Sequence, residues 1–122
     1  MISDETLRFV QSTIRSVWAL DLMILLRQDP GRAWGLDALV RELRSSHSAL
    51  ADIVAAFKRD GLIGEDPPGQ YRWQPSDGLT DRLAEDLARS YATHPVAVVK
   101  AILATPNDRL QTFADAFKIK KD

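Results

Sequence analysis

The stretch that most constrains the fold of this chain is LRSSHSALADIVAAFKRDGLI, residues 43–63. It combines the end of one amphipathic helix, a short polar turn and a second amphipathic helix. Ser45 or Ser46 can cap the second helix, because a serine hydroxyl accepts a free amide hydrogen of the first turn. Gly61 favours the left-handed conformation that ends a helix. The sequence therefore predicts two helices joined by a tight turn, followed by an apolar segment that begins at Leu62.

Apolar periodicity continues this pattern toward the amino terminus. Ser3 is predicted to cap a helix, and apolar residues recur at helical spacing from there to Leu26. The pattern is compatible with one long helix or with two helices that bend near Ser16. Trp34 is expected to anchor a loop or short extended segment, after which a short helix is predicted over residues 36–44.

The segment LIGEDPPGQYRWQP, residues 62–75, predicts a small β-hairpin, because apolar and aromatic residues flank a Pro-Pro-Gly tip. Beyond it the chain is predicted to be helical again, with leucines every four residues from Leu79 and a break at His94 and Pro95. A last helix is predicted to begin near Thr105 and to end in the basic tail KIKK. The apolar residues of this last helix are Leu110, Phe113, Ala114 and Phe117.

Composition limits the possible classes of function. The chain has 122 residues, a formal net charge of −1 and no cysteine. Its length fits a single domain over residues 1–122, and the lack of cysteine excludes disulfides, thiol catalysis and cysteine-bound metals. The charge argues mildly against strong, unspecific binding to nucleic acid. No apolar run predicts a membrane span, and Asp4 and Glu5 stand where a signal peptide would be basic, so a cytoplasmic location is expected.

No motif predicts an enzyme, a cofactor or a metal site. His47 is expected to be a turn residue or a phosphate contact, because no second metal ligand is spaced to help it. His94 is expected to cap a helix, and the carboxylates resemble solvated charges with helical partners, such as Glu85 with Arg89. Neither a phosphate-binding glycine loop nor a nucleophile motif is present. The three tryptophans, Trp18, Trp34 and Trp73, are expected to be core or hairpin anchors.

This order of elements resembles the winged helix-turn-helix fold. The residues that carry the resemblance are Trp34, Leu36, Leu39, Val40, Leu43, Leu50, Val54, Phe57, Gly61, Leu62, Ile63, Tyr71 and Arg72. It covers residues 16–75, and in broad layout the chain is similar to small bacterial regulators of the MarR-like and related groups. The resemblance implies a mostly α fold with a small β-hairpin wing, an amino-terminal helix over residues 4–15 and carboxyl-terminal helices over residues 79–118.

The resemblance also implies where DNA would bind. In this family the second helix of the pair, here residues 46–60, lies in the major groove, and the wing, here residues 63–74, contacts the minor groove or phosphates. The residues of this chain at those positions are Arg44, Ser46, His47, Ser48, Lys58, Arg59, Gln70 and Arg72. The expected function is regulation of transcription by binding double-stranded DNA.

The exposed side of residues 46–60 favours an alternative. Bases are contacted mostly by Arg, Lys, Asn and Gln, whereas this helix offers serine, histidine, alanine and Asp52. Glu65 and Asp66 add negative charge at the tip of the wing. The alternative is an adaptor that binds a protein partner through the alanine face and the carboxyl-terminal helices. Basic groups that converge on one surface would favour DNA binding, and scattered basic groups would favour the adaptor.

The helices outside the winged core carry many apolar residues. These are Leu7, Val10, Ile14, Val98, Val99, Ile102, Leu110, Phe113 and Phe117. Part of this surface is expected to form the interface of a homodimer with two-fold symmetry. The alternative is that these helices fold back and complete the core of a single chain.

Overall fold

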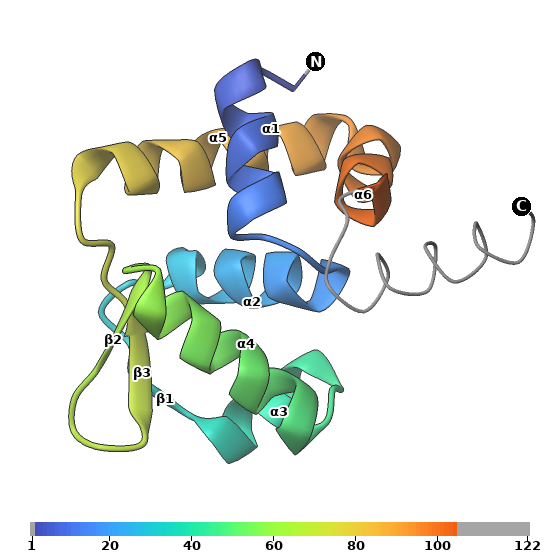
Figure 1. The fold of residues 1–122 in the computed structure, drawn as a ribbon. Coiled ribbons are helices and arrows are strands. Elements are labelled where there is room, and N and C mark those ends of the chain that lie inside the picture. Colours follow the sequence, from blue (N-terminus) through green and yellow to red (C-terminus); the bar gives the residue numbers. More distant parts are fainter. Residues whose placement is uncertain (1, 105–122) are drawn as a thin grey trace, which may run out of the picture.

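The structure is a computed structural model that describes residues 2–104, so the last predicted helix, after Thr105, lies outside the described residues. The described part is mostly helical and contains a small three-stranded antiparallel sheet, as the sequence predicted in outline. The elements are α1 (Asp4–Ser12), α2 (Val17–Gln28), β1 (Trp34–Gly35), α3 (Leu36–Leu43), α4 (His47–Arg59), β2 (Ile63–Glu65), β3 (Gln70–Trp73), α5 (Gly78–Thr93) and α6 (Pro95–Ala104) (Figure 1).

The amino-terminal apolar pattern is divided between two helices. α1 ends at Ser12, α2 begins at Val17, and the two helices are bent by 109°. Ser16 has an extended backbone, and its hydroxyl accepts the amide hydrogen of Ala19 at 3.0 Å. This cap starts a new helix. Of the two arrangements that the sequence left open, the structure has the bent pair.

α3 and α4 are the helix pair predicted from residues 43–63. Arg44 between them is in the left-handed region, with φ 53° and ψ 43°. Ser46 caps α4, because its hydroxyl accepts the amide hydrogen of Ala49 at 3.2 Å. Gly61 follows the C-cap of α4 and has φ 80°, the left-handed conformation that the sequence predicted at this helix end.

The sheet has the strand order β1-β3-β2. Within the hairpin Ile63 pairs with Trp73 and Glu65 pairs with Tyr71. Trp34, expected in a loop or short extended segment, belongs to a third strand that pairs with β3 opposite Tyr71. The hairpin is thereby attached to the segment that leads into α3.

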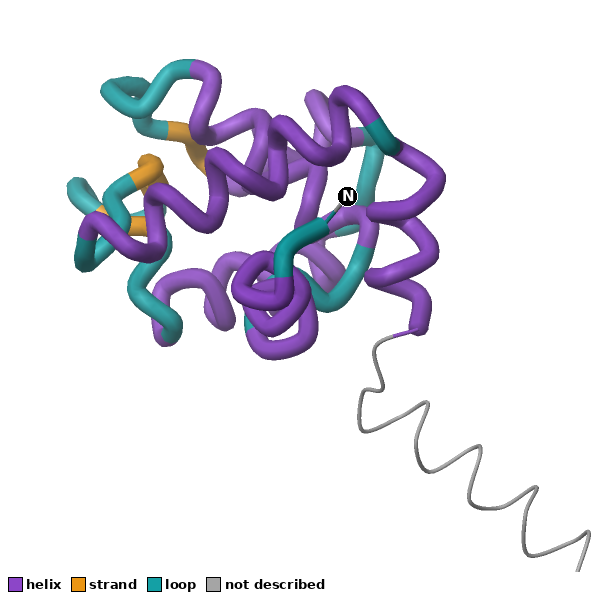
Figure 2. The backbone as a smooth tube through the Cα atoms, turned by 90° about the horizontal axis from the view of Figure 1, so that it is seen from above, coloured by secondary structure: helices purple, strands orange, loops and turns teal. Residues whose placement is uncertain are grey.

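α2 lies between two layers of the molecule. In Figure 1, α1, α5 and α6 lie on one side of it, and α3, α4 and the sheet lie on the other. Figure 2 shows the strands gathered at one end of the helical body. The buried side chains of α2 are Ala19, Leu20, Leu22, Met23 and Leu26. One hydrophobic core therefore joins the outer helices to the helix pair and the hairpin.

The outer helices complete the core of the single chain. Val10, Ile14 and Val98 are fully buried, and Ile102 is 2% exposed. For these four residues the sequence left open a dimer interface or a place in the core of one chain, and the structure places them in the core. Leu110, Phe113 and Phe117 lie outside the described residues. The large apolar side chains that remain exposed in the described part are Trp18, Leu79, Val96 and Leu103.

The expectation that every tryptophan is an anchor is wrong for Trp18. Trp34 and Trp73 are each only 6% exposed, whereas Trp18, in the first turn of α2, is 45% exposed. Trp18 shares a side of α2 with Asp21 and Leu25, because residues three and seven apart line up along a helix. The core leaves this side of α2 partly uncovered.

Candidate nucleic-acid interface

The candidate interface consists of the turn before α4, the exposed side of α4 and the β2–β3 hairpin. α4 turns Leu50, Val54 and Phe57 into the core. The opposite side therefore faces outward, and the residues exposed there are Ser46, His47, Ser48, Ala51, Asp52, Ala55, Lys58 and Arg59. The structure thus places most residues of the predicted DNA site on one exposed helix, with Arg44 exposed in the turn just before it.

At the amino end of α4, the side chain of His47 forms a hydrogen bond with a residue of α3. Its Nε2 lies 2.5 Å from Oδ1 of Asp37, and both side chains are largely exposed. This hydrogen bond, the charge of the ring and the nearby Arg41 together lower the pKa of the Asp37 carboxyl. An exposed pair of this kind contributes little to stability, so a competing phosphate or base can replace Asp37 as the partner of His47.

At the carboxyl end of α4, the side chain of Lys58 forms an ion pair with a residue of the hairpin. Its Nζ donates a hydrogen bond to Oε1 of Glu65 at 2.5 Å, and Oε2 of Glu65 accepts the amide hydrogen of Gly69 at 2.7 Å. These contacts raise the pKa of Lys58 and lower the pKa of Glu65. The winged-helix resemblance placed Lys58 in the expected DNA site, and the structure pairs it with a carboxylate of the proposed wing.

The remaining residues of the expected DNA site differ in the contacts that their side chains make. Nη2 of Arg72 donates to the carbonyl oxygen of Asp66 at 2.7 Å, so this side chain supports the tip of the hairpin. Arg59 is 74% exposed, and its Nε lies 3.5 Å from Oδ1 of Asp60. Arg44 makes no ion pair with a residue that the structure describes. Gln70 is half-buried at the start of β3. The most available cations are therefore at the turn and at the end of α4.

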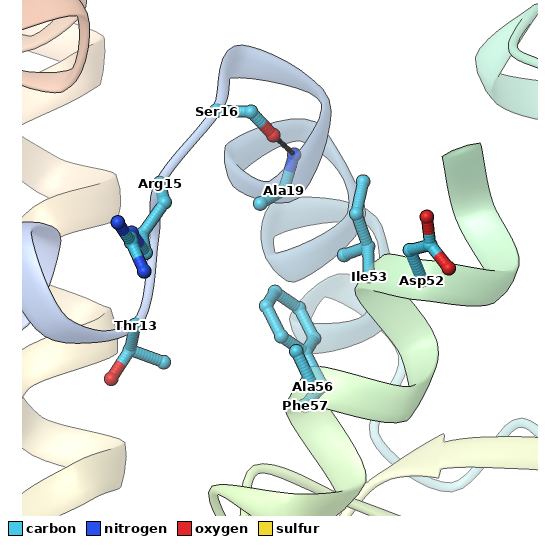
Figure 3. Close-up of a pocket in the computed structure, with 8 residues that line it drawn as sticks. All are labelled: Thr13, Arg15, Ser16, Ala19, Asp52, Ile53, Ala56 and Phe57. Carbon is cyan, nitrogen blue, oxygen red and sulfur yellow. Dashed lines mark hydrogen bonds between the residues drawn. The ribbon is translucent and has the colours of Figure 1, made fainter. Parts of the chain in front are cut away.

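A groove that no sequence motif predicted lies beside α4. It lies between α4, the start of α2 and the connection from α1, and has a volume of about 160 Å³ (Figure 3). Ile53 is half-buried and lines this groove together with Ala56. The bend between α1 and α2 places the connection opposite α4, and the sequence left that bend undecided.

Among residues 2–104, no group of three or more histidine and carboxylate side chains could hold a metal ion. Within the same residues, no single helix is long and apolar enough to cross a membrane.

Comparison with known proteins found no match, whether among family models, curated proteins or solved structures.

Proposed function

We propose that this chain is a transcriptional regulator that binds double-stranded DNA through a winged helix-turn-helix core. In this proposal α4 lies in the major groove and the β2–β3 hairpin is the wing. The observation that carries the proposal is the order α2, β1, α3, α4, β2, β3, in which a tight helix pair runs directly into a hairpin. That hairpin pairs with β1, the strand before α3, so the sheet and the helix pair form one unit.

The outer side of α4 has a shape that suits a groove. Ser48, Ala51 and Ala55 are exposed and small, so the backbone of α4 can come close to the base edges. The major groove of B-DNA, about 12 Å wide, admits an α-helix. Serine hydroxyls can hydrogen-bond to bases, and alanine methyl groups can pack on thymine methyl groups. Base contacts of this kind are few, so we expect modest sequence specificity from one copy.

The charges of the interface predict moderate affinity with a strong dependence on salt. Arg44 and Arg59 are available to phosphates, whereas Lys58 has to exchange Glu65 for a phosphate oxygen. Such an exchange costs less than breaking a buried pair, because the Lys58 side chain is 45% exposed and the Glu65 side chain is 23% exposed. Each phosphate contact releases bound counterions from DNA, which makes the affinity fall as salt rises.

The proposal includes a homodimer formed through α6. Val96 and Leu103 are each 66% exposed, and they share one side of this apolar helix because they are seven residues apart. Two such sides related by a two-fold axis would cover each other. Sedimentation equilibrium of the full chain tests this, and Leu103→Lys should then shift a dimer to a monomer. A full chain that sediments as a monomer at high concentration would contradict the dimer.

A second candidate function is an adaptor that binds another protein. The observation that favours it is the pairing of His47 with Asp37 and of Lys58 with Glu65, which engages one side chain with an acidic partner at each end of α4. What remains between these ends is a surface of small side chains next to an apolar groove. A surface with little net charge and an apolar groove suits a protein segment better than it suits a polyanion.

Amide NMR spectra of the ¹⁵N-labelled full chain, titrated with a short duplex, distinguish these functions. DNA binding through α4 predicts the largest shifts at residues 46–48 and 51–59, little change along α5, and reversal when salt is added. Shifts confined to α6, or no shift at low salt, would contradict DNA binding through α4 and leave the adaptor as the better account.

A further inference from the structure

The groove beside α4 is apolar inside and charged only at its rim. Ala19 of α2 and Ile53, Ala56 and Phe57 of α4 form its inner surface. In Figure 3, Phe57 and Ile53 lie between α4 and the connection that carries Thr13 and Arg15, while Asp52 stands on the outer side. Its volume of about 160 Å³ is close to that of an apolar cavity of ~150 Å³ that accepts benzene. The groove can therefore hold one phenyl ring.

We propose that this groove is bound by residues 105–122 of the same chain, with the ring of Phe113 or Phe117 inserted between α2 and α4. The sequence of this segment places Leu110, Phe113 and Phe117 at helical spacing, which makes one apolar stripe. A stripe with two phenyl rings needs an apolar surface to cover it. This inference does not depend on DNA binding.

The length of the segment allows it to reach the groove. α6 packs against α1, and α1 leads into the connection that forms one wall of the groove. The described chain ends at Ala104 in α6, and residues 105–113 alone can span up to ~30 Å when extended. That distance exceeds the radius of gyration of a domain of this size, about 13 Å.

The rim of the groove carries one basic side chain, Arg15, and one acidic side chain, Asp52. Asp52, on the rim, is exposed and forms no ion pair with the residues that the structure describes. The segment carries Lys118 directly after Phe117, followed by Lys120 and Lys121. A ring of Phe117 in the groove would therefore bring a cation next to the carboxylate of Asp52. The bound segment would cover the flank of α4 that carries Asp52 and Ala56.

Paramagnetic relaxation in the full chain tests this placement. The chain has no cysteine, so Asp122→Cys gives a single site for a nitroxide label. The amide signals of Ala19, Ile53 and Ala56 should lose intensity, whereas Gly69 at the tip of the hairpin should keep it. Reduction of the nitroxide should restore the lost signals. Equal intensities for Ala56 and Gly69 before and after reduction would overturn the proposal.

Two controls make the result specific. Replacing Phe113 and Phe117 together by serine should abolish the loss at Ala56, whereas Thr112→Ser, on the opposite side of the expected helix, should leave it unchanged. A persistent loss in the double variant would contradict insertion of a ring. Mixing ¹⁵N-labelled chain without nitroxide and spin-labelled chain without ¹⁵N tests the source of the segment. Loss of signal in that mixture would show binding to a second copy and would overturn binding within one chain.

Discussion

Nζ of Lys58 lies 2.5 Å from Oε1 of Glu65, so the last turn of α4 is joined to the last residue of β2. The same carboxylate accepts the amide hydrogen of Gly69 across the tip of the hairpin. A single acidic side chain thus links the helix proposed to enter DNA with both sides of the proposed wing. The same side chain also forms an ion pair with Lys58, which is one of the few cations that could contact a phosphate.

Glu65→Gln should strengthen DNA binding. The amide oxygen of glutamine can still accept from Gly69, but Lys58 loses its ionic partner and becomes available to a phosphate. One added phosphate contact should steepen the slope of log K against log salt by about 0.9. Fluorescence anisotropy of a labelled duplex measures both quantities.

The matched control for this prediction is Glu85→Gln. It breaks the exposed pair with Arg89 on α5 and changes the net charge by the same amount. An equal gain of affinity in both variants would show that net charge alone is responsible and would contradict a local role of Lys58.

Arg44→Gly should raise stability and lower DNA affinity together. Arg44 has φ 53°, a conformation that costs a residue with a side chain roughly 1–2 kcal/mol, whereas glycine adopts it freely but loses about 0.5–1 kcal/mol more backbone entropy on folding. The free energy of unfolding should therefore rise by up to ~1 kcal/mol, as measured by urea denaturation. The lost guanidinium should weaken duplex binding in the same variant. A more stable protein with unchanged affinity would exclude Arg44 from the interface.

Gly61→Ala should destabilise the fold. Gly61 has φ 80°, and an added Cβ would lie 2.6 Å from Oγ of Ser76. The left-handed backbone alone should cost ~1–2 kcal/mol in the free energy of unfolding. Gly78→Ala is the matched control, because its Cβ would meet nothing within 4 Å. That variant should leave stability unchanged or raise it by up to ~1 kcal/mol, and a larger loss there than at Gly61 would contradict this account.

Asp77 should make stability fall in acid. Its carboxylate caps α5, and the hydrogen bonds from the amide and side chain of Thr80 lower its pKa. A lowered pKa in the folded state stabilises the protein above roughly pH 3.9, the usual value for aspartate, and this contribution disappears as pH falls through the lowered pKa. Asp77→Ser keeps an acceptor but does not titrate. Its unfolding midpoint should depend less on pH below about pH 4, and identical pH profiles for both proteins would refute the role assigned to Asp77.

Local signals in the sequence predicted the helices and the hairpin, but they could not decide how these elements are oriented. The cap at Ser46 and the left-handed Gly61 follow from local chemistry, and both are present. Ser16 carries the same type of cap, yet apolar spacing continues across it, so the bend between α1 and α2 stayed undecided. The exposure of Trp18 depends on that bend and on what packs against α2, and neither is a local property.

The candidate site was predictable in position but not in its ion pairs. Arg44 and Lys58 were expected at the site from the resemblance to the winged helix-turn-helix fold. The partners Asp37 and Glu65 come from other elements, and they meet His47 and Lys58 only after tertiary packing. The groove beside α4 likewise needs the bent connection before α2, so no local pattern could have predicted it.

DNA binding itself is tested most directly by fluorescence anisotropy of a labelled random duplex, titrated with the full chain at several salt concentrations. The proposal predicts binding at low salt that weakens steeply as salt rises, with a shallower slope for Arg44→Gly. Absence of binding at low salt would contradict the proposal that this chain acts on DNA.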